Sequence, residues 1–163
     1  MSTDVVVRPV RDVDAEMLGR VHAQCWHEDY DTIVSAATLA TLSPLRLAEL
    51  WTHWMNQGEG YHQYAALVDH QIVGFTGSGP ARDEDAPRPK ELYFLHLLDA
   101  FHGRSLGQQL LEAAVGTEPA YLWVPDANEH AVQFYLRNGF APDGVEHDEP
   151  FLGTTIHEIR LVR

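Results

Sequence analysis

Two glycines and an arginine in the stretch His102–Leu111, HGRSLGQQLL, have the types and spacing needed to hold a phosphate. Gly103 and Gly107 lack side chains, so that a phosphate can approach the backbone, and the Arg104 guanidinium can pair with it. A helix that begins here adds unpaired amide groups and the positive end of its dipole. Two glycines near a helix start are more often an ordinary tight turn, and the stretch is neither a Walker loop nor GxGxxG.

Ser105 stands where such a turn favours another glycine. A serine keeps its backbone N–H and adds a hydroxyl donor, so it can serve a phosphate if its φ is negative. A positive φ would cost on the order of 1 kcal/mol and impair the turn. We expect a negative φ, because helix N-termini normally use one.

The elements that position this turn follow from the periodicity of apolar residues. The stretch before it, Glu91–Leu98, is nearly continuous apolar sequence and predicts a central strand. Strands are also predicted at 5–10, 64–68, 71–75, 121–124 and 154–162, and helices at 12–26, 45–55, 103–115 and 128–138. Loops are expected at 27–42 and 81–90. A turn at Asp69-His70 joins the strands at 64–68 and 71–75 in a hairpin. The order of strands and helices therefore indicates an α/β layer with hairpins and not a strict βαβ repeat.

Length and composition limit the class of protein. A chain of 163 residues with 45% hydrophobic residues predicts a single domain over 1–163. A net charge of −13 argues against nucleic-acid and anionic-membrane partners. The sequence shows no bilayer-length apolar run and no signal-peptide order, so we expect a cytoplasmic protein. The ten histidines include no HxxxH or HxH, so no metal site is expected.

A second motif, WVPDANEHAVQFYLRNGF at 123–140, together with ELYFLHLLDAFHGRSLGQQLL, resembles the GNAT superfamily, the Gcn5-related N-acetyltransferases. The family pattern N-x-x-A-x-x-F-Y-x-x-x-G-F is complete here, with Asn128, Ala131, Phe134, Tyr135, Gly139 and Phe140. The family's Q/R-x-x-G-x-G/A loop is matched at Gly107. This chain departs from the family pattern at His102, in the Gln/Arg position, and at Ser105, in the position of the first glycine. The resemblance extends over most of the chain.

The resemblance implies a fold and a donor. The fold is an α/β, GNAT-type mixed sheet, mostly antiparallel, splayed between strands 4 and 5 and flanked by helices. The donor is acetyl-CoA. Its pyrophosphate is expected on the turn made by His102, Gly103, Arg104, Ser105, Leu106, Gly107 and Gln108, and its pantetheine on the backbone of Leu95, His96 and Leu97. Asn128 is expected to contact the donor, although capping a helix would explain this asparagine by itself and is more often the reason for one.

Acetyl transfer to an amine needs a neutral nucleophile and an acid for the leaving thiolate. Tyr135 matches the family tyrosine that protonates the sulfur. Glu91 begins the central strand where histone-acetylating members carry a general base, and a solvated glutamate is an equally good interpretation. His96 is a rival base. Glu91 and His96 point to opposite faces of the strand unless a bulge intervenes.

The acceptor is not specified by the sequence. An acidic stretch at 27–31, HEDYD, lies where the family builds its acceptor wall, and it can hold a cationic amine or simply be solvated. Trp51, Trp54 and Met55 are expected to pack on their helix, with the acceptor site as an alternative. The resemblance also makes a homodimer an expected assembly.

The sequence therefore predicts an acetyl-CoA-dependent N-acetyltransferase that acts on a primary amine by direct attack on the thioester. One alternative is a non-catalytic acyl-CoA-binding or sensing domain, which His102 and Ser105 favour and Tyr135 opposes. A nucleotide-binding module is a further alternative, which the hairpin pattern opposes because such a module needs a parallel sheet.

Overall fold

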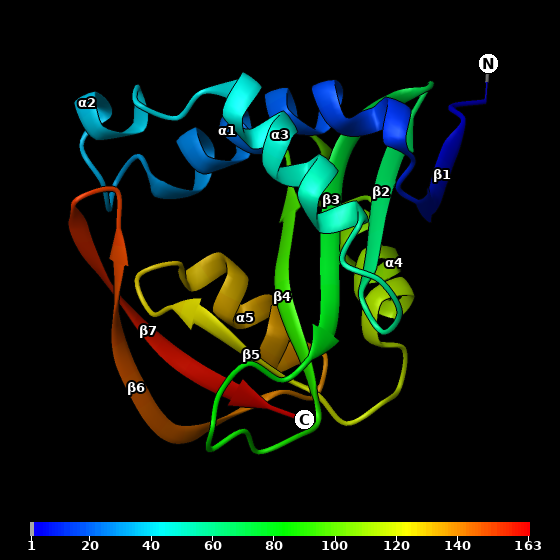
Figure 1. Cartoon of the computed structure of the whole chain (residues 1–163). Helices are drawn as coiled ribbons and strands as arrows, with labels where there is room; N and C mark the ends of the chain where they lie inside the picture. Colours follow the sequence, from blue (N-terminus) through cyan, green and yellow to red (C-terminus); the bar gives the residue numbers. More distant parts are fainter. Residues whose placement is uncertain (1) are drawn as a thin grey trace.

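The computed structural model describes residues 2–163 and contains one open seven-stranded sheet (Figure 1). Its strand order is β1-β2-β3-β4-β5-β7-β6, and all neighbours are antiparallel except β4 and β5. The strands are β1 Val5–Pro9, β2 His62–Val68, β3 Gln71–Pro80, β4 Lys90–Leu97, β5 Tyr121–Pro125, β6 Ala141–Phe151 and β7 Thr154–Val162. The α-helices are α1 Ala15–Tyr30, α2 Ala36–Leu39, α3 Pro44–Met55, α4 Leu106–Val115 and α5 Glu129–Arg137. The mixed, mostly antiparallel α/β fold expected from the sequence is confirmed.

Helices cover both faces of the β1–β4 half of the sheet. Phe75 on β3 packs against Trp51 of α3, whereas Ser78 donates a hydrogen bond to the Ala114 carbonyl of α4, 2.7 Å away. Because successive side chains of a strand point to opposite faces, α3 and α4 lie on opposite sides of β3. β3 is accordingly buried along nearly its whole length. None of the helices in residues 2–163 has the length and apolar character to cross a membrane.

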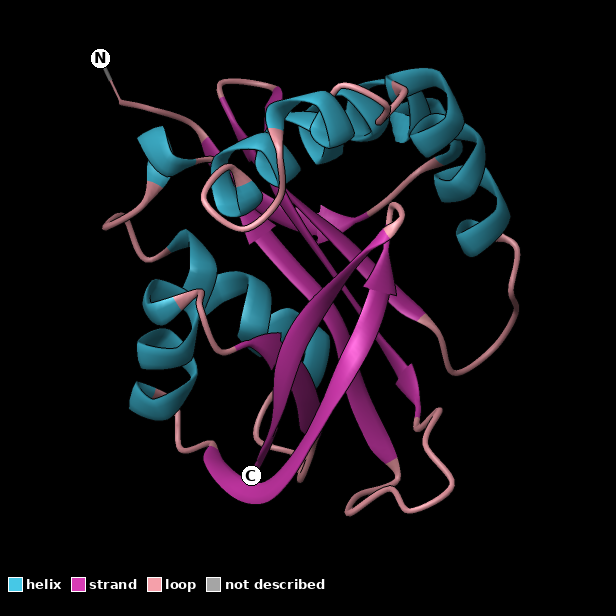
Figure 2. Cartoon of the chain, turned by 90° about the vertical axis from the view of Figure 1, so that its left-hand side faces the viewer, coloured by secondary structure: helices cyan, strands magenta, loops and turns pink. Residues whose placement is uncertain are grey.

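The sheet opens between β4 and β5. These parallel strands pair at two positions, Glu91 with Tyr121 and Leu92 with Leu122. β5 then follows β7 along its full length, from Tyr121 to Pro125. Figure 2 shows the two halves of the sheet crossing and diverging. The edge of β4 from Tyr93 to Leu97 is therefore left without a neighbouring strand on this side.

A one-residue bulge in β4 changes which face Glu91 occupies. In the β3–β4 register Gly77 pairs with Phe94 and Ser78 with Leu92, so Tyr93 is the extra residue. A bulge of this kind shifts the alternation of side chains by one. Glu91 consequently lies on the same face of β4 as His96. Without the bulge, the two side chains would point to opposite faces.

The predicted hairpin turn at Asp69-His70 is confirmed, and two helix ends have clear local causes. Asp69 and His70 both have positive φ, as a two-residue hairpin turn requires. The Ser43 hydroxyl accepts a hydrogen bond from the Arg46 amide, with Pro44 as the first residue of α3. Gly139 ends α5 with a φ of 87°.

Three differences from the predictions concern the elements around the site. α1 continues to Tyr30, and α2 is a further short helix, so residues 27–42 are not one loop. α4 begins at Leu106 and not at Gly103. β6 was not predicted because Pro142, Gly144 and Pro150 resemble a loop, yet its pairing with β7 extends from Ala141 to Phe151.

Candidate functional site

A cavity of about 900 Å³ lies at the opening between β4 and β5. Its wall includes the free edge of β4, the turn before α4, the inner side of α5, the end of α1 and the β6–β7 hairpin. The cavity brings together most of the site residues expected from the sequence. They are Leu95, His96, Leu97, His102, Gly103, Ser105, Gly107, Gln108, Asn128 and Tyr135.

The turn before α4 presents a row of free amide groups. Within residues 2–163, no backbone or side-chain acceptor takes a hydrogen bond from the amides of residues 103–108. The first amide with a partner is that of Gln109, which donates to the Ser105 carbonyl at 3.1 Å. Unpaired amides at the start of a ten-residue helix favour an anion.

The expectation of a negative φ at Ser105 is wrong. Its φ is 60° and its ψ is 10°, in the left-handed region, two residues after Gly103 at φ 76°. The turn needs this conformation to reverse the chain between β4 and α4, and a serine there is strained. The Ser105 hydroxyl makes no capping hydrogen bond to α4.

His102 has a structural partner as well as a place in the cavity wall. Its Nε2 lies 2.9 Å from the Leu97 carbonyl oxygen, and its ring stacks on that of His130 with centroids 4.7 Å apart. The imidazole therefore occupies one of the backbone acceptors that the sequence analysis assigned to the donor's pantetheine. It also joins the end of β4 to the start of α5.

Arg104 and Leu106 have side chains outside the cavity wall. The Arg104 side chain is exposed, with its guanidinium 5.3 Å from the Phe101 ring centroid. Leu106 is fully buried in the core beneath α4. These two residues contribute backbone amides to the turn.

Tyr135 projects from α5 into the cavity. Its ring packs against Phe134 and Phe140, and the residue is 6% exposed. Burial raises the pKa of the Tyr135 phenol above its usual value, and the Asp29 carboxylate adds to that rise. The hydroxyl therefore keeps its proton near neutral pH and can donate it.

Asn128 caps α5. Its side-chain oxygen accepts a hydrogen bond from the Ala131 amide at 3.2 Å, and the residue also forms part of the cavity wall. The capping interpretation is confirmed, and contact with the donor stays a prediction.

Glu91 lies away from the cavity. The residue is 1% exposed, and its carboxylate accepts hydrogen bonds from the Arg82 amide and guanidinium and from the Tyr121 hydroxyl. The closest of these contacts is 2.8 Å, from the Arg82 guanidinium. These contacts tie the 81–90 loop to the β4–β5 junction.

His96, in contrast, faces the cavity beside Asp29. The His96 Nδ1 is 2.8 Å from the Asp29 carboxylate, which links β4 to the last turn of α1. Behind His96 lies His22, buried among Trp51, Phe75 and Phe94 and accepting a hydrogen bond from the Trp51 indole at 3.2 Å. Burial lowers the pKa of His22 to about 3, so this imidazole is neutral.

The end of the cavity opposite the turn has an aromatic and acidic wall. Trp26 stacks on Phe151 at 4.2 Å and on Tyr30 at 4.5 Å between ring centroids. Asp29 and Glu158 bring carboxylates to this wall. We call this part, Trp26, Asp29, Tyr30, Phe151 and Glu158, the acidic wall.

The acidic stretch 27–31 contributes through a helix and not through a loop. Asp29 and Tyr30 face the cavity from the last turn of α1, whereas His27 and Asp31 are exposed. Trp51 and Met55 pack in the core, as expected, and Trp54 packs against the same core while also forming part of the cavity wall.

Phe151 and Glu158 were missed by the sequence analysis. They reach the site because β6 and β7 form a long hairpin that returns to the end of α1. The signal in the sequence was the alternation of such residues with polar ones, which is typical of a strand. Pro150 and Gly153, which are more typical of loops, obscured that alternation.

Comparison with known proteins finds sequences similar to this chain. The model of the acetyltransferase (GNAT) family matches residues 22–140. A curated relative, the mycothiol acetyltransferase of Propionibacterium freudenreichii subsp. shermanii, is 36% identical over 76 residues. That match covers 43% of this chain and 24% of the relative, so it spans about a quarter of the relative's length.

Solved structures with the same fold cover nearly the whole chain. The PaiA N-acetyltransferase of Thermoplasma acidophilum, in complex with coenzyme A, has a TM-score of 0.75 and 20% identity over 96% of this chain and 98% of that one. The ribosomal-protein-alanine N-acetyltransferase of Brucella melitensis has a TM-score of 0.70 and 18% identity over 97% and 98%. At these identities the likeness concerns the fold.

Proposed function

The chain belongs to the acetyltransferase (GNAT) family, and on that premise we propose that it transfers an acetyl group from acetyl-CoA to a primary amine by direct attack on the thioester. The observation that carries the proposal is the cavity at the β4–β5 opening. The free amides of residues 103–108 and the buried Tyr135 hydroxyl both face it.

The turn before α4 is proposed to hold the donor's pyrophosphate. Its free amides and the dipole of α4 favour a polyanion, and the exposed Arg104 can add a guanidinium at the surface. The free edge of β4 offers backbone groups to the amides of the pantetheine, except where His102 already takes the Leu97 carbonyl. Bound acetyl-CoA supplies a thioester carbonyl as the electrophile.

Tyr135 is proposed as the acid for the leaving thiolate. Its raised pKa means that the phenol is protonated throughout the neutral range, so Oη has a proton to give. Packing against Phe134 and Phe140 fixes the ring in the wall of the cavity. A fixed donor needs little reorganisation during the reaction.

His96 is proposed as the group that takes the amine proton, with Asp29 as its positioning residue. An ionised carboxylate accepts only, so the 2.8 Å contact places the His96 proton on Nδ1 and leaves the Nε2 lone pair free. Within residues 2–163, Nε2 has no hydrogen-bond partner. Glu91 fits this role less well, because its carboxylate already accepts four hydrogen bonds outside the cavity.

A cationic amine is the proposed class of acceptor. Asp29 and Glu158 in the acidic wall attract an ammonium group, and the rings of Trp26, Tyr30 and Phe151 suit a cation or an aliphatic chain. The net charge of −13 makes the field around the protein negative as well, which also attracts a cationic acceptor.

A non-catalytic acyl-CoA-binding domain is the second candidate. The strained Ser105 and the His102–Leu97 hydrogen bond favour it, since both alter the donor side of the cavity. Such a domain would bind the donor without releasing its thiol.

Two measurements test the proposal in sequence. The melting temperature should rise with acetyl-CoA, CoA and desulfo-CoA and stay unchanged with ATP or NAD, because only a ligand of the folded state stabilises it. Thiol release from acetyl-CoA should then be followed with paired amines that differ in one additional positive charge, and the more cationic member should have the higher kcat/KM. Stabilisation without thiol release for any amine would favour the second candidate, and no stabilisation by any CoA compound would reject both.

A further inference from the structure

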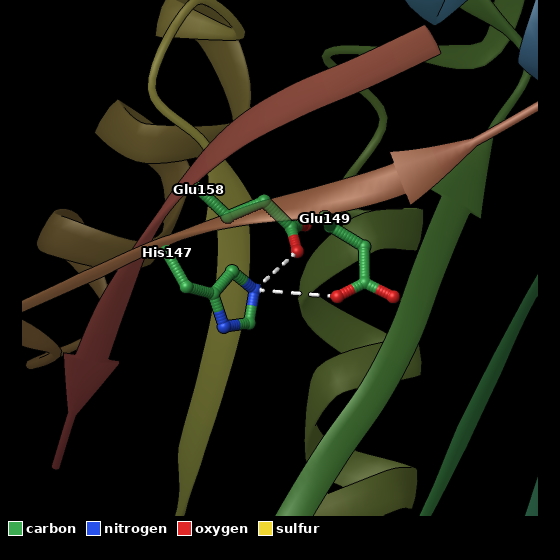
Figure 3. A group of neighbouring side chains, drawn as sticks. All are labelled: His147, Glu149 and Glu158. Atoms are coloured by element: carbon green, nitrogen blue, oxygen red, sulfur yellow. Dashed lines mark hydrogen bonds and ion pairs between the residues drawn. The ribbon is translucent and has the colours of Figure 1, made fainter. Parts of the chain in front are cut away.

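Three possible metal ligands meet on one face of the β6–β7 hairpin, as Figure 3 shows. His147 and Glu149 are two residues apart on β6, so their side chains share a face of the strand. Glu158 on β7 is the cross-strand partner of His147. No metal site was expected from the sequence, because the histidines are not paired at ligand spacing. This group contains a single histidine, and its third ligand comes from the neighbouring strand.

The ligand atoms are spaced almost as a metal ion requires. His147 Nε2 is 2.9 Å from Glu158 Oε1 and 3.7 Å from Glu149 Oε2, and the three ligand atoms lie within 4.8 Å of one another. Bonds of about 2.0–2.2 Å to one central ion place neighbouring ligand atoms roughly 3–3.5 Å apart. A small rotation of the exposed Glu149 side chain brings the three atoms to that spacing.

The imidazole and one carboxylate are already held in place. Trp123 of β5 stacks on the His147 ring with centroids 3.7 Å apart and planes 15° apart. The Trp123 indole is itself fixed by a 2.7 Å hydrogen bond to Asp83. Glu158 is half-buried between the strands, so both groups lose little freedom when they bind an ion.

Within residues 2–163, neither of the two carboxylates forms an ion pair with an arginine or a lysine. Arg160, on the same face of β7, is 2.6 Å from Asp143 and 3.2 Å from Asp85. Arg82 is paired with Glu91.

We propose that His147, Glu149 and Glu158 bind one divalent transition-metal ion, with water completing its coordination. An imidazole nitrogen beside two carboxylates suits Zn²⁺, Co²⁺ or Ni²⁺ and not Mg²⁺ or Ca²⁺, which prefer oxygen alone. Glu158 also belongs to the acidic wall, so the metal ion and a cationic acceptor would compete for this carboxylate, and Asp29 would remain to attract the amine.

The test is metal binding to the full chain after treatment with EDTA and removal of the chelator. Calorimetric titration with Zn²⁺ should show one equivalent bound, and Co²⁺ should give visible ligand-field absorption. Excess Mg²⁺ should not displace either ion. Glu149→Gln and His147→Ala should each weaken Zn²⁺ binding by more than about tenfold.

A second histidine supplies the matched control. His157 lies on the opposite face of the same hairpin, with Asp148 at 2.9 Å and Glu146 at 3.1 Å. His157→Ala should leave the Zn²⁺ affinity unchanged. The proposal is overturned if the wild-type protein binds no stoichiometric Zn²⁺, if Glu149→Gln and His147→Ala leave the affinity intact, or if His157→Ala abolishes it. Glu149 is largely exposed, so its variant should keep the fold even if His147→Ala does not.

Discussion

The two ends of the cavity are built in different ways. The donor end, where we propose that acetyl-CoA binds, consists mainly of backbone, with the edge of β4, the turn before α4 and the start of α5, all between residues 93 and 135. The acidic wall consists of side chains from α1 and from the β6–β7 hairpin, which are more than 100 residues apart in the chain. A backbone cradle suits a ligand common to a whole family, whereas side chains from distant segments can change with the acceptor.

The largest effect should come from Tyr135→Phe, at the junction of the two ends. Loss of the proton at Oη should lower kcat by about 10²–10⁴-fold while the Kd for CoA stays nearly the same. Steady-state kinetics and calorimetry measure the two quantities. Tyr64→Phe, on β2 outside the cavity wall, is the control and should leave kcat unchanged. An unaltered kcat in Tyr135→Phe would remove this residue from the chemistry.

The second largest effect should come from His96 on β4 and from Asp29 in the acidic wall. His96→Ala should lower kcat/KM by about 10²-fold and remove the acidic limb of its pH profile, because the amine proton loses its acceptor. Asp29→Asn should have a smaller effect on kcat and shift that limb. The pH dependence of kcat/KM for each variant is the measurement.

Glu91→Gln separates the two candidate bases. Losing the carboxylate that accepts from Arg82 and Tyr121 should cost about 1–3 kcal/mol of unfolding free energy and leave the acidic limb in place. If the limb disappears with Glu91→Gln and persists with His96→Ala, the assignment is reversed.

Acid should weaken the fold through His22, beneath the acidic wall. The folded-state pKa of about 3 lies below the value of about 6.5 in the unfolded chain, so between these values the unfolded state binds the extra proton. The unfolding free energy should therefore fall as pH decreases through this range, by about 1.4 kcal/mol per pH unit. Urea unfolding at pH 7 and at pH 5 measures how much unfolding free energy each protein loses between the two pH values. This loss should be about 2 kcal/mol smaller in His22→Gln than in the wild type. Equal pH dependence in both proteins would contradict the neutral buried imidazole.

The smallest effect belongs to the donor end. Ser105→Gly should raise the unfolding free energy by about 1 kcal/mol, because glycine adopts the φ of 60° without strain. Gly103→Ala in the same turn should lower it by a similar amount, since an added Cβ there meets no atom within 4 Å and only its φ of 76° is unfavourable. Chemical denaturation measures both. Two changes of the same sign would show that side-chain contacts, not φ, decide the stability of this turn.

The donor end was largely predictable from the sequence. The pattern from Asn128 to Phe140 and the turn after β4 are contiguous, and both segments form part of the cavity wall. The φ of Ser105 was not predictable, because the local preference of serine gave way to the path that the chain must take between β4 and α4. Similarly, the bulge at Tyr93 depends on the register with β3 and leaves no signal in β4 itself.

The acidic wall was much less predictable. Asp29 and Tyr30 were singled out in a predicted loop, but their direction is set by a further turn of α1. β6 has Pro142, Gly144 and Pro150, so its strand exists because β7 offers a long partner and not because of local propensity. Phe151 and Glu158 reach the cavity through this tertiary pairing, which a single sequence does not report.

The two-position pairing of β4 with β5 has a consequence for how substitutions combine. Within residues 2–163, the β6–β7 hairpin has no hydrogen bond or ring contact with residues 102–108, although Leu161 of β7 and Leu111 of α4 belong to one core cluster. Changes in sites without shared partners add in free energy. Substitutions on the hairpin and substitutions in the turn should thus act independently, so the acceptor end can diverge in sequence without a compensating change in the donor cradle.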